Sequence, residues 1–409
     1  MRFFLQATRA LLLSSLAFSS ACTDGDGLET QNGNAAAAPG IPAAAGRPFR
    51  VEPVAQFDEP WAMTFLPGGR LALVTERPGR LKLWRVGTEL LVDVRGVPQV
   101  DHGGQGGLGD VVLHPDFENN NLVYLSWVEA GEGGTRGAVV GRARLNIVTD
   151  LIATRLDGGE ERADLLGSIT DLQVIWRQVP KVEGRGHFGH RLAFGPDGML
   201  YISNGERQKF DPAQDPAQHL GKIVRLHDDG RTPPDNPWAS RGGVTAQLWT
   251  MGHRNPLGLA FDAQGRLWEH EMGPQGGDEF NLIARGRNYG YPIVSNGSHY
   301  GGEDIPDHHT RPEFEAPKVW WNPSVSPAGL IVYSGSLFPQ WRGDAFMGAL
   351  SGESLIRIDL DGANAREGDR WPMAARIREV EQGPDGAIYL LEDGGQGSGG
   401  RLLRLTPSR

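Results

Sequence analysis

The sequence has a single cysteine in 409 residues, so no disulfide can form within the chain. The N-terminal apolar run, Ala10 to Phe18, is far shorter than the roughly 20 residues that a membrane span needs. Positive charge is not in excess either, because 40 Lys and Arg stand against 50 Asp and Glu. The formal net charge of −10 disfavours a nucleic-acid partner.

Long amphipathic helical stripes are few, whereas glycine (58 residues) and proline (28) are abundant. The glycines do not follow the strict spacing of collagen, so this composition favours an all-β protein rich in turns. With 39% hydrophobic residues, the chain has enough apolar material for one large domain or two ordinary ones.

The N-terminus has the pattern of an export signal. A basic start, the apolar run and the small residues at 19–21 predict a signal peptide over residues 1–21 and a periplasmic or cell-envelope location. Cys22 follows the cleavage site directly, so two alternatives stand: a lipid anchor at Cys22, or plain secretion. Ser19 stands where lipoprotein signals usually have leucine. Residues 22–48, rich in Gly, Ala, Asn and Pro, are expected to form a flexible linker.

From Phe49 onward a short pattern recurs: strand, glycine-containing turn, strand. Clear copies surround Gly69, Gly198, Gly265 and Gly386, and weaker copies surround Asn120 and Gly343. Asp-Gly and Gly-Gly turns between alternating apolar residues are typical of hairpins. The spacing predicts that residues 49–409 form a six-bladed β-propeller of four-stranded antiparallel blades. The strand at residues 49–51 and the terminal RLLRLTP are expected to close the ring within one blade. The alternative is a pair of β-sandwiches.

Two polar loops precede strands in the N-terminal half. The stretch GRGHFGHR contains His187 and His190, and we expect His187 to act as a general base. The stretch GQGGLG matches a dinucleotide-binding pattern, but a strand-like run follows it where that motif needs a helix. We therefore interpret it as a glycine-packed loop presenting Gln105, with a purely structural turn as the alternative.

Further polar loops lie in the C-terminal half. His253, Arg254 and Asn255 stand just ahead of a strand, where they point into a channel or remain a solvated loop. The loop from His270 to Pro292 offers backbone carbonyls and carboxylates, which are the oxygen ligands that Ca²⁺ requires. The competing interpretation is a loop that its own hydrogen bonds make rigid.

Arg376 and Arg378 alternate on a strand, so their side chains share one face. Either they bind an anion or they belong to a surface ion-pair ladder with Glu379 and Glu381. The segment SHYGGEDIPDHH is rich in histidine and aspartate, but no regular element orients these side chains, so a polar loop is favoured over a transition-metal site.

The motifs GHFGHRLAFGPDG, GHRNPLGLAF, EMGPQGGDEFNL, RNYGYP and RIREVEQGPDG occur in one order along the chain. Together they resemble the soluble aldose and glucose dehydrogenases that depend on pyrroloquinoline quinone (PQQ), over nearly all of residues 49–409. The resemblance implies a six-bladed propeller with PQQ and Ca²⁺ in its channel. It also implies an aldose substrate oxidised at C1 to the lactone, and an electron acceptor that these motifs do not identify.

The resemblance also assigns roles to single residues. It implies that His187 is the catalytic base, that Glu206 orients it, and that Arg254 belongs to the same catalytic group. It implies contacts with the cofactor for Gln105, His187, Arg254, Asn255, Asp278, Arg376 and Arg378. It implies that the carbonyls of Gly273 and Pro274 bind the calcium on the cofactor, and that Glu279 and Tyr289 belong to a second, structural calcium site.

Elementary chemistry agrees with these assignments. PQQ carries three carboxylates, so a net-acidic protein needs arginines concentrated where it binds. The sequence departs from the family at four positions: Met272, Ser351, Gly186 and His190. The first two replace a polar contact and a lysine, changes that weaken PQQ binding or suit another ligand.

Two other functions fit a propeller. One is a non-enzymatic envelope protein that binds a glycan or a protein, which does not require Arg254, Arg376 and Arg378 to converge. The other is a metal-dependent lactonase, which requires carboxylate and Asn ligands at the channel centre.

Overall fold

The computed structural model describes residues 46–150, 164–395 and 399–408. These residues belong to one compact unit, which spans Gly40–Arg409. The predicted signal peptide, Cys22 and the linker as far as residue 45 lie outside the described residues, so export and lipid anchoring stay predictions. No helix in the described part of the chain is both long and apolar enough to cross a membrane.

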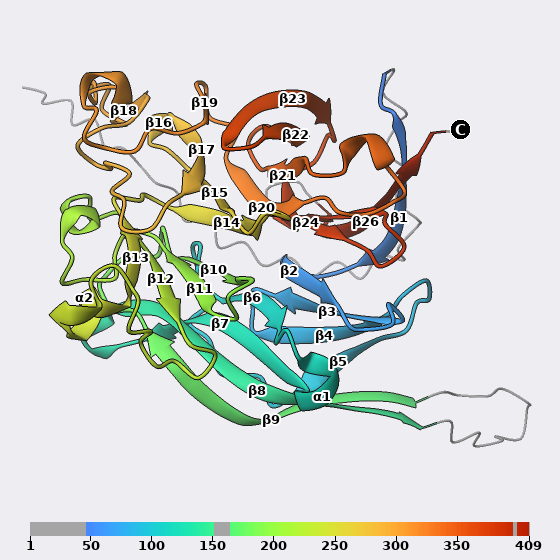
Figure 1. The fold of residues 1–409 in the computed structure, drawn as a ribbon. Helices are drawn as coiled ribbons and strands as arrows, with labels where there is room; N and C mark the ends of the chain where they lie inside the picture. The colour runs from blue at the N-terminus through green and yellow to red at the C-terminus, as the bar shows by residue number, and fades with distance from the viewer. Residues whose placement is uncertain (1–45, 151–163, 396–398, 409) are drawn as a thin grey trace, which may run out of the picture. The chain divides into compact units, whose positions relative to one another are not determined.

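The regular secondary structure of the described chain is almost all β, as the composition predicts (Figure 1). Its α-helices, α1 (Phe117–Asn120) and α2 (Gly243–Gln247), are about one turn each. Short 3₁₀ segments lie at Glu132–Gly134, Asp211–Gln214, Ala239–Arg241, His308–Thr310 and Pro339–Trp341. Long polar loops therefore connect the strands without helical crossovers.

Four sheets are four-stranded and antiparallel. In spatial order, the first sheet consists of β10 (Gly189–Phe194), β11 (Leu200–Asn204), β12 (Lys222–Leu226) and β13 (Leu248–Met251), and the second of β14 (Pro256–Phe261), β15 (Leu267–Glu271), β17 (Asp278–Ile283) and β19 (Val319–Trp321). The third sheet consists of β20 (Pro327–Val332), β21 (Ala345–Ala349), β22 (Ser354–Asp361) and β23 (Asn364–Pro372). The fourth consists of β24 (Ile377–Gln382), β25 (Ile388–Glu392), β26 (Arg401–Pro407) and β1 (Phe49–Gln56).

A further sheet consists of two antiparallel runs of four strands. One run is β2 (Pro60–Phe65), β3 (Leu71–Glu76), β4 (Arg80–Arg85) and β5 (Leu91–Arg95), and the other is β6 (Leu108–Leu113), β7 (Leu122–Ala130), β8 (Arg136–Asp150) and β9 (Asp164–Arg177). A short parallel pairing of β5 with β9 joins them. A small two-stranded ribbon pairs β16 (Gln275–Gly276) with β18 (Gly297–Ser298).

The repeated turns predicted from sequence are confirmed as the hairpins between the first and second strands of the six groups. Gly69, between β2 and β3, shows why glycine is needed. Its φ of +67° lies in the left-handed region, and a Cβ there would stand 2.3 Å from the Pro384 side chain.

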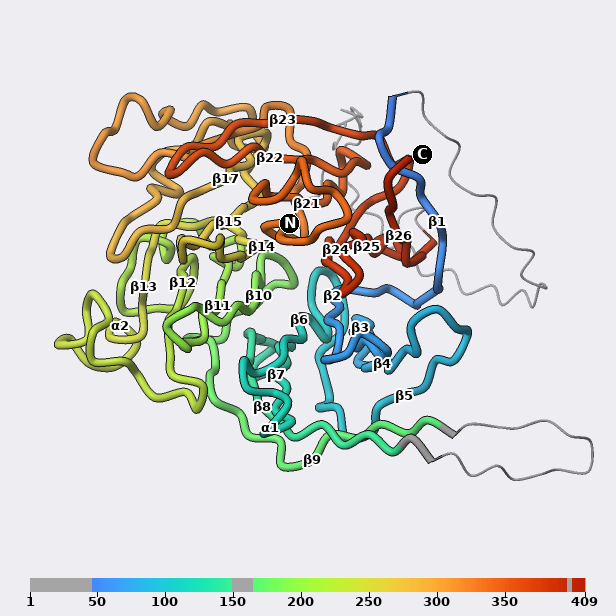
Figure 2. Tube along the Cα trace, turned by 45° about the vertical axis from the view of Figure 1, so that its right-hand side comes forward, coloured from blue at the N-terminus to red at the C-terminus, as the bar shows by residue number. Residues whose placement is uncertain are grey.

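The first strands of the groups pack against one another in chain order. These strands are β2, β6, β10, β14, β20 and β24, each in contact with the next, and β24 also contacts β2. The expected pairing of the chain's two ends is confirmed, because β1 runs antiparallel to β26 with Phe49 opposite Pro407 (Figure 2). The apolar cores lie between neighbouring sheets, whereas charged residues on the first strands are buried where these strands meet.

Candidate functional site

A cavity of about 320 Å³ is lined by residues of the first strands, of the loops that precede them and of the loops that follow the second strands. One part of its wall is apolar and is formed by Trp61, Phe188, Leu257 and Met272. Another part is strongly polar and is lined by Gln105, Ser326, Asp393 and three arginines, Arg77, Arg376 and Arg378. Such a combination suits a flat organic ligand with anionic groups at one end.

The arginines of this cavity outnumber its carboxylates. Arg376 Nε donates to Asp393 Oδ2 at 3.0 Å, and Arg378 donates to Asp393 Oδ1 from Nε at 2.8 Å and from Nη2 at 2.6 Å. Burial raises the pKa of Asp393, but the two guanidiniums lower it more, so the pKa lies below its ordinary value. The Arg376–Arg378 pair therefore lines a cavity and is not a surface ladder, and its partner is Asp393.

His187 and Glu206 form a buried pair beside this cavity. His187 Nδ1 lies 2.5 Å from Glu206 Oε1, and the His187 backbone N–H donates to Gln105 Oε1 at 2.8 Å. The other Glu206 oxygen accepts the backbone N–H groups of Lys209 and Phe210. His187 has a φ of +50°, so the pair is held by an unusual backbone conformation just ahead of β10.

The surroundings keep this imidazole neutral and its partner ionised. Burial lowers the pKa of His187; the Glu206 carboxylate raises it in part, and the Arg254 charge lowers it again. Burial acts to raise the pKa of Glu206, but the hydrogen bond from His187 and the charges nearby bring it below its ordinary value. With Nδ1 bonded to the carboxylate, Nε2 is left as the proton acceptor.

Arg254 and Asn255 are adjacent to this pair. Arg254 Nη1 donates to the carbonyl of Met272 at 3.0 Å and to that of Gly273, and the Arg254 carbonyl accepts the backbone N–H of Glu206 at 2.8 Å. Asn255 Nδ2 lies 3.9 Å from Met272 Sδ. Asn255 Oδ1 is buried and has no hydrogen-bond partner among the described residues.

The loop that contains Gly273 and Pro274 is fixed by a carboxylate. Asp278 Oδ1 accepts the backbone N–H of Gly273 at 2.9 Å, while Oδ2 accepts Ser324 Oγ–H at 2.6 Å and the N–H groups of Val325 and Ser326 at 2.7 Å each. Asp278 thus stands behind the cavity wall. Its contacts are those expected of a loop that its own hydrogen bonds make rigid.

Glu279 and Tyr289 belong to a separate buried cluster. Glu279 Oε1 lies 3.0 Å from His308 Nε2, and the Tyr289 ring stacks on His253 with centroids 4.7 Å apart. His253 Nδ1 lies 3.0 Å from Glu271 Oε1. One potential ligand atom from each of His253, Glu269 and Glu271 falls within 4.8 Å of the others.

Sequence reasoning missed Glu269 and Glu271. Both lie on β15 two residues apart, so they share a face, and β15 pairs with β17 so that Glu271 is opposite Glu279. Burial raises the pKa of Glu269 and of Glu279. The signal available in the sequence was the E-x-E spacing at the end of a strand that begins with Leu267 and Trp268.

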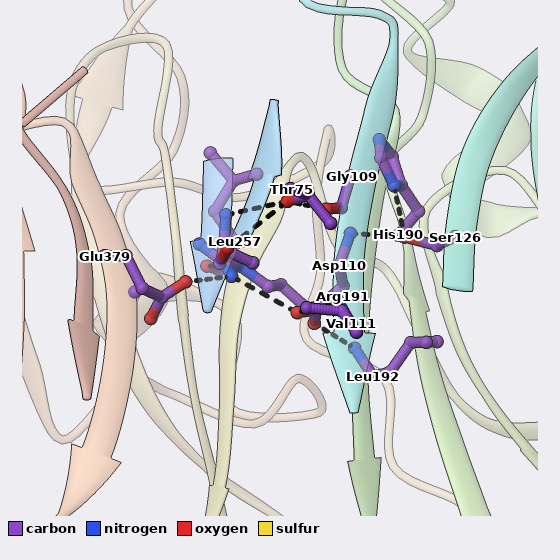
Figure 3. Close-up of polar contacts among 12 residues, drawn as sticks. Thr75, Gly109, Asp110, Val111, Ser126, His190, Arg191, Leu192, Leu257 and Glu379 are labelled. Carbon is purple, nitrogen blue, oxygen red and sulfur yellow. Dashed lines mark hydrogen bonds and ion pairs between the residues drawn. The ribbon is translucent and has the colours of Figure 1, made fainter. Parts of the chain in front are cut away.

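Sequence reasoning also missed a charged network centred on Arg191 (Figure 3). Its Nε donates to the Leu257 carbonyl at 2.9 Å, and its Nη1 pairs with Glu379 and lies 3.6 Å from Asp110 Oδ1. Its guanidinium carbon also sits 3.9 Å from the centre of the Trp61 ring.

A second cavity, of about 180 Å³, is lined by residues of β2, β6, β10, β14, β20 and β24, including Asp110, Arg191, Glu379 and Glu381. Burial raises the pKa of Glu379 to about 7, against the opposing effect of Arg191. Carboxylates therefore do gather where the first strands meet, but Arg191 pairs with Glu379 and Asp110 there, and no Asn among the described residues lines this cavity, whereas a lactonase metal site requires both carboxylate and Asn ligands.

The structure shows the surroundings of three of the four departures from the family pattern, Met272, Ser351 and His190. Met272 lines the larger cavity, whereas Ser351 Oγ lies 2.8 Å from Ser326 Oγ near its edge. His190 stacks on Trp61 with centroids 5.0 Å apart and lies 2.7 Å from Ser126 Oγ, so it is a packed wall residue. Burial lowers the pKa of His190 to about 3, which keeps it neutral.

Comparison with known proteins agrees with this geometry. The family model described as "Glucose / Sorbosone dehydrogenase" matches residues 57–404. The aldose sugar dehydrogenase YliI of Escherichia coli is 38% identical over 359 residues, covering 86% of this chain and 91% of the relative.

Two solved structures are similar over the same region. A glucose dehydrogenase crystal structure has a TM-score of 0.79 at 40% identity, covering 88% of this chain and 100% of that one. The PQQ-bound aldose sugar dehydrogenase of Streptomyces coelicolor has a TM-score of 0.68 at 29% identity, covering 88% and 98%. The chain therefore belongs to the glucose/sorbosone dehydrogenase family.

Proposed function

We propose that this chain is a PQQ-dependent aldose sugar dehydrogenase that oxidises C1 of an aldose to the lactone. The observation that carries the proposal is the convergence at one cavity of Arg376 and Arg378 with the buried pair His187–Glu206 beside it. A non-enzymatic glycan- or protein-binding propeller does not need this arrangement. The matching location is the cell envelope, reached through the predicted signal peptide, with Cys22 lipidated or the chain released.

In this proposal the six strand groups are the blades of a six-bladed propeller. The cyclic contacts from β2 through β24 and back to β2 support it, as does the pairing of β1 with β26. The larger cavity then lies at one mouth of the central channel, where loops from several blades meet.

The residues of the larger cavity fit PQQ. Its volume of about 320 Å³ is within the range of small-molecule sites, and its apolar walls suit a fused aromatic ring system. Arg376 and Arg378 would hold carboxylates of the cofactor, because guanidinium binds carboxylate with two parallel hydrogen bonds. Gln105 and the unpaired Asn255 Oδ1 offer further polar contacts.

The residues also fit a calcium ion next to the cofactor. The carbonyl oxygens of Gly273 and Pro274 would hold it, since hard cations prefer oxygen ligands. The Gly273 carbonyl accepts a hydrogen bond from the cationic Arg254, so an ion that binds this oxygen would have to share it with Arg254 or displace that hydrogen bond. When bound, PQQ would supply an acceptor for the hydride that leaves C1, and Ca²⁺ would supply a Lewis acid that favours this transfer.

The chain's own residues supply the proton chemistry. His187 Nε2 removes the proton from the C1 hydroxyl, and general base catalysis of this kind contributes roughly 10²–10⁴-fold. Glu206 keeps the ring in the tautomer that leaves Nε2 free to accept a proton, and its negative charge stabilises the imidazolium that forms. Arg254 opposes protonation before the sugar arrives, so the base is ready at neutral pH.

The second calcium site is proposed at the buried cluster around Glu279. Glu269, Glu271 and Glu279 place three carboxyl groups near His253, and Tyr289 packs on that histidine. Burial raises the pKa of Glu269 and of Glu279, and a divalent cation bound there would favour their ionised forms.

The test is the absorption spectrum of the full chain mixed with PQQ and Ca²⁺, before and after glucose is added. We expect a shifted cofactor spectrum on binding and its reduction by the sugar. His187→Ala should bind PQQ and show no rapid reduction. An unchanged PQQ spectrum at micromolar protein and cofactor would refute the proposal.

A further inference from the structure

Arg207, the residue after Glu206, is a cation that the surrounding chain buries completely. Its Nε donates to the Gly186 carbonyl at 2.8 Å, its Nη1 to the Arg136 carbonyl at 2.9 Å and its Nη2 to the Gly184 carbonyl at 2.6 Å. Burial lowers the pKa of Arg207 to about 9, so the side chain stays cationic at neutral pH. Burying a charge is costly unless hydrogen bonds compensate it, and three backbone carbonyls do so here.

Arg207 contacts the residues on both sides of His187. Gly186 precedes the histidine, and the Phe188 ring, which follows it, has its centre 3.7 Å from the Arg207 guanidinium carbon. The Gly186 carbonyl and the His187 N–H belong to the same peptide unit, and that N–H donates to Gln105 Oε1 at 2.8 Å. This peptide unit is therefore held at both ends, by Arg207 at its oxygen and by Gln105 at its nitrogen.

A held peptide unit matters at this position because the backbone of His187 is strained. Its φ of +50° lies in the left-handed region, which few residues other than glycine adopt. Since φ is the rotation about the N–Cα bond of His187, turning the preceding peptide unit would turn the imidazole relative to Glu206. The space is also tight, because a Cβ on Gly205 would stand 2.3 Å from the His187 carbonyl oxygen. Glu206 thus holds the ring, and Arg207 holds the backbone from which the ring extends.

The charge of Arg207 acts on the same imidazole. Burial, the largest influence, lowers the pKa of His187, and Glu206 raises it in part. The charges of Arg254 and Arg207 both lower this pKa again. Arg207 acts from behind the cavity wall, because it lies on the Phe188 ring that lines the larger cavity and has no exposed surface of its own. Its effect on a reaction in that cavity must therefore pass through His187 or Phe188.

We propose that Arg207 is a positioning residue, which holds the Gly186–His187 peptide unit so that the imidazole Nδ1 stays bonded to Glu206 and Nε2 stays free to accept a proton. This inference rests on the proposed function, because a free Nε2 matters only when a sugar hydroxyl reaches it. The alternative is a purely structural arginine. Its loss would lower the free energy of unfolding and leave a folded chain in which His187 is unchanged.

Nuclear magnetic resonance of the full chain, with isotopically labelled histidine and without PQQ, tests this role. The signal that is absent from His187→Ala identifies His187. In Arg207→Met the pKa of His187 should rise, since a positive charge is lost, and the signal of the Nδ1 proton bonded to Glu206 should broaden or disappear. Arg207→Lys keeps the charge but not the planar fork of donors. It should keep the pKa of His187 close to that of the wild-type chain and still weaken the Nδ1 proton signal.

Lys222 supplies the matched control, because it is also fully buried and its Nζ donates to three backbone carbonyls. Lys222→Met should lower the midpoint of urea unfolding, as Arg207→Met does. It should leave the pKa and the Nδ1 proton signal of His187 as they are in the wild-type chain.

Turnover of glucose by the PQQ- and Ca²⁺-reconstituted full chain gives a second readout. Both Arg207 variants should lower kcat about 10–100-fold with KM within about threefold, because a base displaced by about 1 Å loses rate rather than binding. The resonance signals require neither cofactor nor sugar, so they test Arg207 even if the proposed function fails.

A folded Arg207→Met chain whose His187 signals match those of the wild-type chain would overturn the inference. If Arg207→Met does not fold, the Nδ1 proton signal of Arg207→Lys decides, and a signal equal to that of the wild-type chain would leave Arg207 a structural residue only.

Discussion

At the scale of single residues, the proton-transfer group is defined by what surrounds one imidazole. His187 is buried, its Nδ1 is bonded to Glu206, and the charge of Arg254 disfavours its protonated form. The family resemblance implied that Glu206 orients His187 and placed Arg254 in the same catalytic group, and the structure brings the three residues together. Neither the left-handed φ of His187 nor the two backbone N–H groups on Glu206 could be predicted from residue types, because both depend on loop geometry.

The pH dependence of Glu206→Gln tests this description. Glu206 raises the pKa of His187, so its removal lowers that pKa further and moves the acid limb of kcat/KM to lower pH. The imidazolium also loses its partner, so kcat should fall by about 10²–10³-fold. Steady-state rates between pH 4.5 and 8 check both effects. An acid limb that moves upward, or a kcat within twofold of wild type, would contradict the assignment.

At the scale of elements, the hairpins could be predicted from the sequence, but the contacts that individual strand residues make across the sheet could not. Turn glycines such as Gly198 and Gly265 have local signatures, and both turns occur where expected. The carboxyls of β15 and β17 are different, because Glu271 and Glu279 become neighbours only through strand register. Asp278, at the start of β17, was expected to contact a cofactor; that its carboxylate also ties together the loops of Gly273 and Val325 could not be predicted from its neighbours in the sequence.

The β15–β17 carboxyls give a prediction about stability. Burial raises the pKa of Glu269 and Glu279 above the ordinary value of 4.5, so above that pH the unfolded chain has released protons that the folded chain retains. Without a cation, the free energy of unfolding should therefore fall as pH rises from about 4.5 toward neutrality.

Calcium should reverse this loss at pH 7. An ion present at 100 times its dissociation constant adds about 2.7 kcal/mol to the free energy of unfolding. Thermal unfolding with Ca²⁺ and with a chelator measures the difference, and Glu269→Gln should reduce it. Glu315→Gln, a carboxyl outside the cluster, is the matched control. Equal Tm values with Ca²⁺ and with chelator would exclude a calcium ion at this site.

At the scale of the whole described unit, Arg191 links strands that are remote in sequence. It lies on β10 and contacts Trp61 on β2, Asp110 on β6, Leu257 on β14 and Glu379 on β24 (Figure 3). Glu379 is 188 positions from Arg191 in the sequence, so no local sequence pattern predicts that the two residues form an ion pair. The repeat predicted that several strands would meet, but it did not indicate which charge would hold them.

Arg191→Met tests whether this arginine holds the first strands together. The change leaves Glu379 and Asp110 buried without their cation, and breaking a buried pair in this way costs about 3–5 kcal/mol. Arg191→Met combined with Glu379→Leu should regain a large part of that loss, because two apolar groups then replace a charge pair.

The control is Arg366→Ala, which removes an exposed ion pair with Asp359 and should lower the free energy of unfolding by less than about 1 kcal/mol. Urea unfolding of the wild-type chain and the three variants measures these differences. If Arg191→Met were as stable as Arg366→Ala, the strands would have to be held by the apolar cores between the sheets alone, and the charged network would have no structural role.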